Sequence, residues 1–499
     1  MTKILFQSGA LQEATADTVA DFVFEGSSRL IGLGSSKQGG SLSRVLKRDG
    51  FSGKVGTLYQ WHPAGGAPVR RYLVAGLGPR KQYRLETLRR ACAAVARKLR
   101  TYPDRHLALP LAAGPGGAAD AAEMARAGVE GVLLGNYQFT KYRTCIPKPS
   151  LSLETIHIIA PGGRKSQVEK GIREGKLAAE ATNFARDLVS EPAGFLNPSR
   201  MVAIAKKVAK ENGLACEVLE GARLRKLGMG GLLGVGQGSS EPPYLVLLTY
   251  RPRGRKARKR VGIVGKGITF DSGGLSLKNA DSMETMKCDM AGAACVLAVM
   301  RALPSLAPPV EVVGVLALAE NMPGGKAIRP GDILKMHSGL TVEVRNTDAE
   351  GRLILGDALS YLAKQSVDEM INLATLTGAC VVALGPLCAG VMGNNQTLIN
   401  RVLKSADRSG EMMWQLPLFE DYLYQVESDV ADIRNAGNRW GGAITAGLFL
   451  KKFVQDSIPW AHIDIAGPAF LDDDTYHTPK GATGAGVRTL LRLLSDGNR

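Results

Sequence analysis

Two series of short apolar runs, each alternating with amphipathic helical segments, extend through the 499-residue chain, and this alternation constrains its fold most. A strand, a helix and a second strand in that order form a parallel sheet with helices on its faces. In the first series, strands are predicted at Lys3–Gln7, Tyr72–Gly76, Leu107–Ala112 and Thr155–Ile159, and helices at Leu85–Leu99 and Ala119–Leu134. We therefore predict an N-terminal α/β domain over residues 1–165.

A long connecting helix is predicted over 166–188, because apolar residues recur there at helical spacing with no glycine or proline after Gly175. Glu191-Pro192 and Asn197-Pro198 follow and stop the helix. In the second series, strands are predicted at Tyr244–Tyr250, Val261–Val264, Val310–Leu318, Met370–Ala374 and His462–Ala466. The predicted fold class is α/β, with two α/β domains joined by a long helix, and the C-terminal domain (189–499) has a central mixed sheet flanked by helices.

Positive charge is concentrated in two places. The chain carries 63 Lys and Arg against 46 Asp and Glu, and residues 1–165 hold 24 of the basic but only 11 of the acidic residues. Arg251–Arg260 (RPRGRKARKR) adds seven positive charges in ten residues. Basic patches favour polyanions, which makes DNA binding one alternative. The run lies between two predicted strands, however, so we favour a solvated hairpin turn.

The cellular location is predicted to be cytoplasmic. Seven scattered cysteines without a CxxC pair indicate reduced thiols. No secretory signal is predicted, because Glu13 and Asp17 interrupt the N-terminal segment before an apolar region can form. The uncharged stretch 371–400 could span a bilayer by length, but its Gly, Pro and Asn residues predict two buried strands and their turns. We therefore expect no membrane association.

Candidate site residues follow the predicted strands of the second domain, where α/β proteins place their chemistry. A glycine-rich loop with Lys266 and Asp271 is predicted directly after the strand at Val261–Val264. Glycine lets the backbone approach a ligand closely, but Gly267 follows the lysine where a nucleotide-binding loop has Ser or Thr. Further along, Asp289 precedes an apolar helix, and in isolation such an aspartate indicates a helix N-cap.

A third segment places Asp348 and Glu350 two residues apart, where an extended backbone would point both carboxylates the same way. Two like charges held together need a cation or a proton to relieve them. The six histidines are far apart and no HExxH occurs, so His337 and His462 are interpreted as core or surface residues. If metal is bound, carboxylate oxygens would be its ligands, which suits a pair of hard divalent ions.

Six motifs of this sequence closely resemble the leucyl (cytosol) aminopeptidase family, whose bacterial members are dinuclear metallo-aminopeptidases. They are VGKGITFDSGG (Val264–Gly274), MKCDMAGAA (Met286–Ala294), NMPGGKAIRPGD (Asn321–Asp332), NTDAEGRL (Asn346–Leu353), ATLTGAC (Ala374–Cys380) and HIDIAGPA (His462–Ala469). The resemblance is strong from about residue 180 to the C-terminus and weak in the N-terminal third. It departs at Gly324, where a serine is expected.

The resemblance implies a hydrolase that releases N-terminal Leu, Met and other apolar residues from peptides with a free amine, using water activated by two divalent metal ions (Mn²⁺ or Zn²⁺). The implied metal ligands are Lys266, Asp271, Asp289, Asp348 and Glu350, with Asp271 and Glu350 bridging. A lysine can serve as a ligand because two adjacent cations oppose protonation of its amine.

The resemblance also implies catalytic roles for Lys278, which would polarise the scissile carbonyl, and for Arg352, which would hold a bicarbonate ion as general base. Gly351 and Leu376 would bind the same bicarbonate, and the start of a helix at Gly351 favours an anion there. The implied side-chain pocket consists of Met286, Thr375 and Gly378.

The family further implies a cytoplasmic homohexamer with catalytic domains (189–499) at its centre and N-terminal domains outside. Because some relatives bind DNA, a DNA-binding hexamer that uses the basic surface is the alternative function. A third possibility is an inactive structural hexamer, against which the presence of both Lys278 and Arg352 argues.

Overall fold

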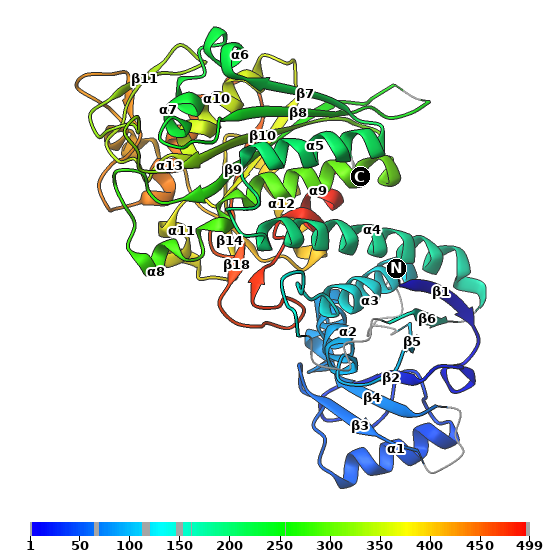
Figure 1. Cartoon of the computed structure of the whole chain (residues 1–499). Coiled ribbons are helices and arrows are strands. Elements are labelled where there is room, and N and C mark those ends of the chain that lie inside the picture. Colours follow the sequence, from blue (N-terminus) through cyan, green and yellow to red (C-terminus); the bar gives the residue numbers. More distant parts are fainter. Residues whose placement is uncertain are drawn as a thin grey trace. The chain divides into compact units, whose positions relative to one another are not determined.

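The computed structural model describes residues 2–63, 69–111, 120–145, 153–160, 162–254 and 256–495 (Figure 1). Three parts of the predictions lie outside these residues: the strand end at Ala112, the helix start at Ala119 and Arg255 of the basic run. The chain divides into two compact units. Unit 1 contains residues 1–180 and 473–479, and unit 2 contains residues 181–472 and 480–499.

A six-stranded sheet with the order β1-β6-β5-β2-β4-β3 forms the centre of unit 1. Its strands are β1 (Lys3–Ser8), β2 (Thr18–Val23), β3 (Leu58–Trp61), β4 (Arg71–Gly76), β5 (His106–Pro110) and β6 (Thr155–Ala160). All neighbouring strands are parallel except β3 and β4. The helices are α1 (Lys37–Arg48), α2 (Leu85–Leu99) and α3 (Ala121–Gly135), with single turns at η1 (Leu11–Glu13), η2 (Arg80–Gln82) and η3 (Gly162–Arg164).

Both faces of this sheet are covered. Ala20 and Phe22 of β2 pack into the same core as α2 and α3, whereas Val19 and Val23 pack into a second core with α1. Successive side chains of a strand point to opposite faces, so the two helix layers lie on opposite sides of the sheet. This arrangement confirms the α/β class of the N-terminal part.

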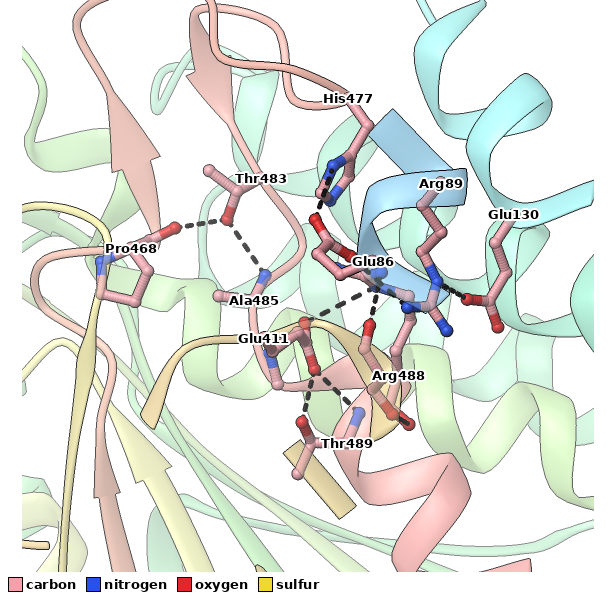
Figure 2. A network of polar contacts seen from close by, with 12 residues as sticks. Glu86, Arg89, Glu130, Glu411, Pro468, His477, Thr483, Ala485, Arg488 and Thr489 are labelled. Atoms are coloured by element: carbon pink, nitrogen blue, oxygen red, sulfur yellow. Dashed lines mark hydrogen bonds and ion pairs between the residues drawn. The ribbon is translucent and has the colours of Figure 1, made fainter. Parts of the chain in front are cut away.

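The segment 473–479 belongs to unit 1 although it lies near the C-terminus. His477 Nδ1 lies 3.5 Å from Glu86 Oε1 on α2 (Figure 2). Arg97, also on α2, donates hydrogen bonds to the backbone oxygens of Thr475 and Tyr476. Side-chain contacts with α2 therefore fix this segment in the N-terminal unit.

The long helix predicted over 166–188 is confirmed as α4 (Lys165–Ser190). The helix ends just before Glu191-Pro192, as predicted. Asn197-Pro198 instead begins the next helix, α5 (Pro198–Asn212), because the Asn197 side chain accepts a hydrogen bond from the N–H of Arg200 and proline fits the first helical position.

A mixed eight-stranded sheet with the order β15-β14-β17-β13-β9-β10-β8-β7 forms the centre of unit 2. Its strands are β7 (Ala215–Glu220), β8 (Tyr244–Tyr250), β9 (Arg260–Asp271), β10 (Glu311–Asn321), β13 (Glu369–Ala374), β14 (Ala389–Gly393), β15 (Met413–Gln415) and β17 (Trp460–Asp464). All five strands predicted for this part are present. Strand β9 lies between β10 and β13 and is parallel to both.

The remaining elements of unit 2 surround this sheet. The helices are α6 (Gly221–Lys226), α7 (Gly230–Gly236), α8 (Ala280–Met283), η4 (Met286–Met290), α9 (Ala291–Leu306), α10 (Gly351–Ala363), α11 (Gly378–Leu384), α12 (Gln396–Ser409), η5 (Glu420–Gln425), α13 (Gly442–Lys451) and α14 (Val487–Ser495). Short strands form two further sheets, β11 (Ile333–Lys335), β12 (Thr341–Glu343) and β16 (Ile433–Arg434) in one, and β18 (Phe470–Leu471) and β19 (Gly481–Ala482) in the other.

Helices α9 and α10 pack on opposite faces of β9. A Cβ atom at Gly262 would lie 2.5 Å from Leu362 of α10, whereas one at Gly265 would lie 2.4 Å from the backbone oxygen of Gly292 in α9. Glycine at these positions lets both helices approach the central strand closely. The contact at Gly292 holds the start of α9 beside β9. The start of α10 lies against β9 as well, because a Cβ atom at Gly351 would lie 2.6 Å from the Lys266 side chain.

The predicted hairpin between β8 and β9 is wrong. Strand β10 lies between them, antiparallel to β8 and parallel to β9. The basic loop is held at both ends, because Arg251 and Arg260 lie 3.4 and 3.5 Å from Glu311 and Lys259 lies 2.7 Å from Glu369.

The stretch 371–400 contains the two predicted buried strands, within β13 and β14. A short helix, α11, stands between them where only turns were predicted, because Thr377 caps it by accepting a hydrogen bond from the N–H of Cys380. Elsewhere, the helical stretch Ala280–Leu306 is long and apolar enough to cross a membrane, but most of it is buried inside the protein, as a core helix is.

Candidate active site

Strand β9 positions the first two candidate residues. The prediction of a loop from Lys266 onward is wrong, because β9 continues as far as Asp271 in register with β10. Residues five apart would face opposite sides of a regular strand. Ile268 pairs with Ala319 and Asp271 with Asn321, so β9 contains one extra residue in this interval. Such a bulge returns Asp271 to the face of Lys266.

The Lys266 ammonium group is buried between two carboxylates. Its Nζ lies 2.9 Å from Asp289 Oδ2 and 2.8 Å from Glu350 Oε1, and it donates a hydrogen bond of 2.9 Å to the backbone oxygen of Thr375. Gly351 leaves room for this side chain, because a Cβ atom there would lie 2.6 Å from Nζ. The interpretation of Asp289 as an N-cap is wrong: it lies in the turn η4, and Met290 is the N-cap of α9.

A second ammonium group, that of Lys278, pairs with Asp271 and Asp348. One carboxylate oxygen each of Asp271, Asp348 and Glu350 lies within 4.8 Å of the others. The carboxylates of Asp348 and Glu350 therefore converge as predicted. The reason is not an extended backbone, because Asp348 lies in a turn and Glu350 has the helical angles φ −77° and ψ −34°.

The electrostatic balance of this cluster favours additional positive charge. In the described part of the chain, the four carboxylates of the cluster pair with two ammonium groups. Burial raises the pKa of Glu350 to about 7, with a further increase from Asp271, and burial raises the pKa of Asp289 and Asp348 above their usual range. Burial lowers the pKa of Lys266, but the neighbouring carboxylates raise it above its ordinary value.

The donor set of the cluster fits divalent cations. Oε2 of Glu350 is buried and has no hydrogen-bond partner among the described residues. Oxygen atoms from three carboxylates converge at this point, which is the chemistry that hard divalent ions prefer. A bound cation would give Glu350 Oε2 a partner and would neutralise the excess negative charge of the carboxylate cluster.

Arg352 is buried at the beginning of α10, and the prediction that Gly351 and Arg352 lie at a helix N-terminus is confirmed. Its Nη1 donates a 2.7 Å hydrogen bond to the backbone oxygen of Asn435, while its Nε has no hydrogen-bond partner in the part of the chain that the structure describes. Burial lowers its pKa to about 10, although Glu350 and Asp464 oppose the shift. The N–H of Leu376 donates to Asp464 Oδ1 at 3.1 Å.

The three predicted pocket residues begin or follow elements around the cluster. Thr375 follows the last residue of β13, Gly378 begins α11 and Met286 begins η4. A Cβ atom at Gly378 would meet no atom within 4 Å, so the space beside this residue is open. Their common role in one pocket stays a prediction.

Two buried asparagines of the site were missed by the sequence analysis. The Asn321 side chain donates hydrogen bonds to Asp271 Oδ1 (2.8 Å) and to the backbone oxygen of Thr347 (3.0 Å). The Asn435 side chain donates to the backbone oxygen of Asn346 (2.7 Å), which fixes the acidic segment. Asn321 begins one of the six motifs and could have been found, whereas no local pattern marks Asn435.

His462, which was predicted to be a core or a surface residue, lies in the core. Its ring is fully buried, stacks on Trp460 and contacts the Asn372 side chain at 2.8 Å. Burial lowers its pKa to about 3, so it is neutral in the fold.

Comparison with known proteins identifies relatives over nearly the whole chain. The model of the cytosol aminopeptidase family matches with its catalytic domain at residues 183–491 and with its N-terminal domain at residues 25–145. The probable cytosol aminopeptidase of Solibacter usitatus is 46% identical over 89% of this chain and 91% of its own length. That of a Sulfurihydrogenibium species is 42% identical over 97% and 96%.

Solved structures give the same result. The bottromycin maturation enzyme BotP in complex with Mn is 40% identical, with a TM-score of 0.86 and coverage of 96% of this chain and 99% of that chain. A mutant of tomato leucine aminopeptidase is 34% identical, with a TM-score of 0.90 and coverage of 99% and 96%.

Proposed function

This chain belongs to the cytosol aminopeptidase family and is a metallo-exopeptidase hydrolase, and from that premise we propose that it releases Leu, Met and other apolar residues from the N-termini of peptides by two-metal hydrolysis. The observation that carries the proposal is the convergence of Asp271, Asp348 and Glu350 beside Lys266 and Asp289. Peptides with a free N-terminal amine would be the substrates.

We propose that five side chains would hold the two metal ions: Lys266, Asp271, Asp289, Asp348 and Glu350, of which Asp271 and Glu350 would contribute to both. Mn²⁺ is the first candidate, because the related BotP structure contains Mn, and Zn²⁺ is the second. When bound, the ions would supply Lewis acidity and fix the amine and first carbonyl of the peptide. Lys266 would bind as the neutral amine, with its carbonyl partner at Thr375 keeping the side chain in place.

Lys278 would remain charged and act on the substrate. Its Nζ lies 2.9 Å from Asp271 Oδ2 and pairs with Asp348, so it stands at the edge of the carboxylate cluster. From this position the ammonium group would polarise the scissile carbonyl and stabilise the oxyanion that forms on it. The surrounding carboxylates keep it protonated, because they raise its pKa against the effect of burial.

Arg352 would hold bicarbonate, which would accept the proton of the attacking water. A buried guanidinium at a helix N-terminus, whose Nε has no hydrogen-bond partner among the described residues, supports this assignment, as does the N–H group of Gly351 at the same end. The N–H group of Leu376 would be shared between bicarbonate and Asp464, because it already donates a hydrogen bond to Asp464.

The first side chain of the peptide would enter a pocket formed by Met286, Thr375 and Gly378. The open space beside Gly378 supports this position, and a mostly apolar lining would prefer Leu or Met.

We propose a cytoplasmic homohexamer as the assembled state. The family description as cytosol aminopeptidases supports the location. Unit 2 exposes large apolar side chains, including Val382 (90%), Trp414 (67%) and Trp440 (65%), and such exposure supports an interface with further copies of the chain.

The proposal is tested with leucine anilide and its N-acetylated form, assayed after incubation with Mn²⁺ and again with a chelator. We expect cleavage of the free-amine substrate only, and loss of that cleavage in the chelator. No cleavage of either substrate by protein with two bound metal ions would refute the proposal.

DNA binding is a second candidate function, supported by the exposed cations Arg253, Lys256 and Arg258 in the loop between β8 and β9. Charge reversal of these three and of Arg255 is expected to abolish salt-sensitive retention on DNA. Unchanged retention would exclude the loop as the site.

A further inference from the structure

Thr375 contacts two of the proposed metal ligands, the carboxylate of Asp289 and the ammonium group of Lys266. Its Oγ1 donates a hydrogen bond of 2.6 Å to Asp289 Oδ1 and lies 3.2 Å from the backbone oxygen of the same residue. Its own backbone oxygen accepts the 2.9 Å hydrogen bond from Lys266 Nζ. The pocket role given to Thr375 above accounts for neither contact.

We propose that Thr375 is a positioning residue for the metal ligands Asp289 and Lys266, an inference that rests on the function proposed above. A hydroxyl group has one proton to donate, and Asp289 receives it. With Oδ1 held in this way, the other oxygen, Oδ2, points at Lys266 Nζ at 2.9 Å. The Thr375 hydroxyl group therefore orients the proposed metal ligand Asp289.

The two ends of the Thr375 side chain then have separate roles. Because the hydroxyl proton is used by Asp289, only the Cγ2 methyl group is available to the apolar side chain of a substrate. Loss of the hydroxyl should weaken metal binding, and loss of the methyl group should weaken substrate binding. This separation makes the inference testable with two substitutions at one position.

The backbone of Thr375 is well suited to hold ligands in place. It directly follows β13, which is hydrogen-bonded to β9 on one side and to β17 on the other. In the β13–β9 register Leu373 pairs with Gly265, which places the carbonyl group of Thr375 beside Lys266. Ligands held by a central strand keep their geometry better than ligands held by a loop.

The experiment compares full-length, metal-stripped wild type with Thr375→Val and Thr375→Ser by calorimetric titration with MnCl₂ in the absence of substrate. Removal of a hydrogen-bond partner behind a metal ligand lowers metal affinity about 10–100-fold. We expect this loss in Thr375→Val for one of the two Mn²⁺ equivalents, with the other unchanged. Thr375→Ser should bind Mn²⁺ like the wild type but show a raised KM for leucine anilide at saturating Mn²⁺.

Thr489→Val is the matched control, since the Oγ1 of Thr489 in α14 donates a hydrogen bond of the same length, 2.6 Å, to Oε2 of the partly buried Glu411 (Figure 2). It should lower the melting temperature about as much as Thr375→Val and leave both Mn²⁺ affinities unchanged. The inference is wrong if Thr375→Val binds Mn²⁺ with wild-type affinity, or if Thr375→Ser loses as much Mn²⁺ affinity as Thr375→Val does. Wild type that binds no Mn²⁺, or binds it without cleaving leucine anilide, would instead refute the proposed function.

Discussion

Replacement of Gly351 by alanine should disrupt the site through a single methyl group. The added Cβ would lie 2.6 Å from both Cε and Nζ of Lys266, and 2.8 Å from its Cδ. Ordinary contacts begin near 3.4 Å, so the lysine end must move by about 0.8 Å. Its contacts with Asp289, Glu350 and Thr375, now 2.8–2.9 Å, would then exceed hydrogen-bond length for at least one partner.

The magnitude follows from these contacts. One lost hydrogen bond between charged groups costs about 1.5–3 kcal/mol in a buried site. Alanine in place of a helical glycine returns about 0.5–1 kcal/mol, so the metal-free protein should lose about 1–2 kcal/mol of unfolding free energy. Displacement of a proposed ligand should also weaken Mn²⁺ binding by at least about tenfold.

Urea unfolding in a chelator measures the first effect and calorimetric titration with MnCl₂ measures the second. The matched control is Gly40→Ala, because Gly40 lies on the exposed side of helix α1 and a Cβ there would meet no atom within 4 Å. The control should gain about 0.5–1 kcal/mol with unchanged Mn²⁺ affinity. If Gly351→Ala behaves like this control in both measurements, the close packing of Lys266 against Gly351 does not position the ligand.

Three further predictions follow from the site and its support. Asp348→Asn removes a charged ligand and should lower the metal content in elemental analysis; full occupancy would remove Asp348 from the ligand set. Arg352→Ala should retain both metals but lose most of its rate, with partial recovery on addition of bicarbonate, and loss of metal instead would show that the arginine is structural. Burial raises the pKa of Asp357 to about 7 in the folded protein, against about 3.9 in the unfolded chain. Protonation of Asp357 therefore stabilises the native state relative to the unfolded state. That stabilisation is complete below about pH 4 and is lost as the pH rises through 7. Urea unfolding at pH 5 and 8 should show that Asp357→Asn abolishes this part of the pH dependence of the unfolding free energy. If the wild type and the variant differ by the same unfolding free energy at both pH values, the prediction is wrong.

The sequence was sufficient for the central strands of unit 2 but not for the length of β9. The local pattern predicts that the strand ends where the apolar run meets Lys266, because charged side chains are rare in buried strands. The groups that make this burial possible, Asp289, Glu350 and the carbonyl of Thr375, are far away in the sequence. The bulge that turns Asp271 toward Lys266 likewise depends on pairing with β10.

Strand β2 was missed for a similar reason. Its apolar pattern is interrupted by Asp21, which is buried in the structure. The carboxylate accepts hydrogen bonds of 2.7 Å from the N–H groups of Phe22, Gly32 and Leu33. Only the folded chain brings these donors around the acid, and without them burial of a carboxylate is unfavourable.

The candidate residues themselves could be found because the motifs preserve residue types, whereas their geometry could not. An extended backbone was the predicted reason for the convergence of Asp348 and Glu350, yet Asp348 lies in a turn and Glu350 is the N-cap of α10. Asn435 supports the same segment from 89 positions away in the chain. A local pattern cannot indicate a partner at that distance.

The discontinuity of unit 1 has a consequence for synthesis on the ribosome. Residues 181–472 separate its two parts, so translation at about 5–20 residues per second leaves an interval of about 15–60 s between them. During that time α2 lacks the contacts that Glu86 and Arg97 later make with the segment 473–479. The N-terminal unit therefore emerges first but is completed almost last, after the strands of the central sheet of unit 2 have left the ribosome.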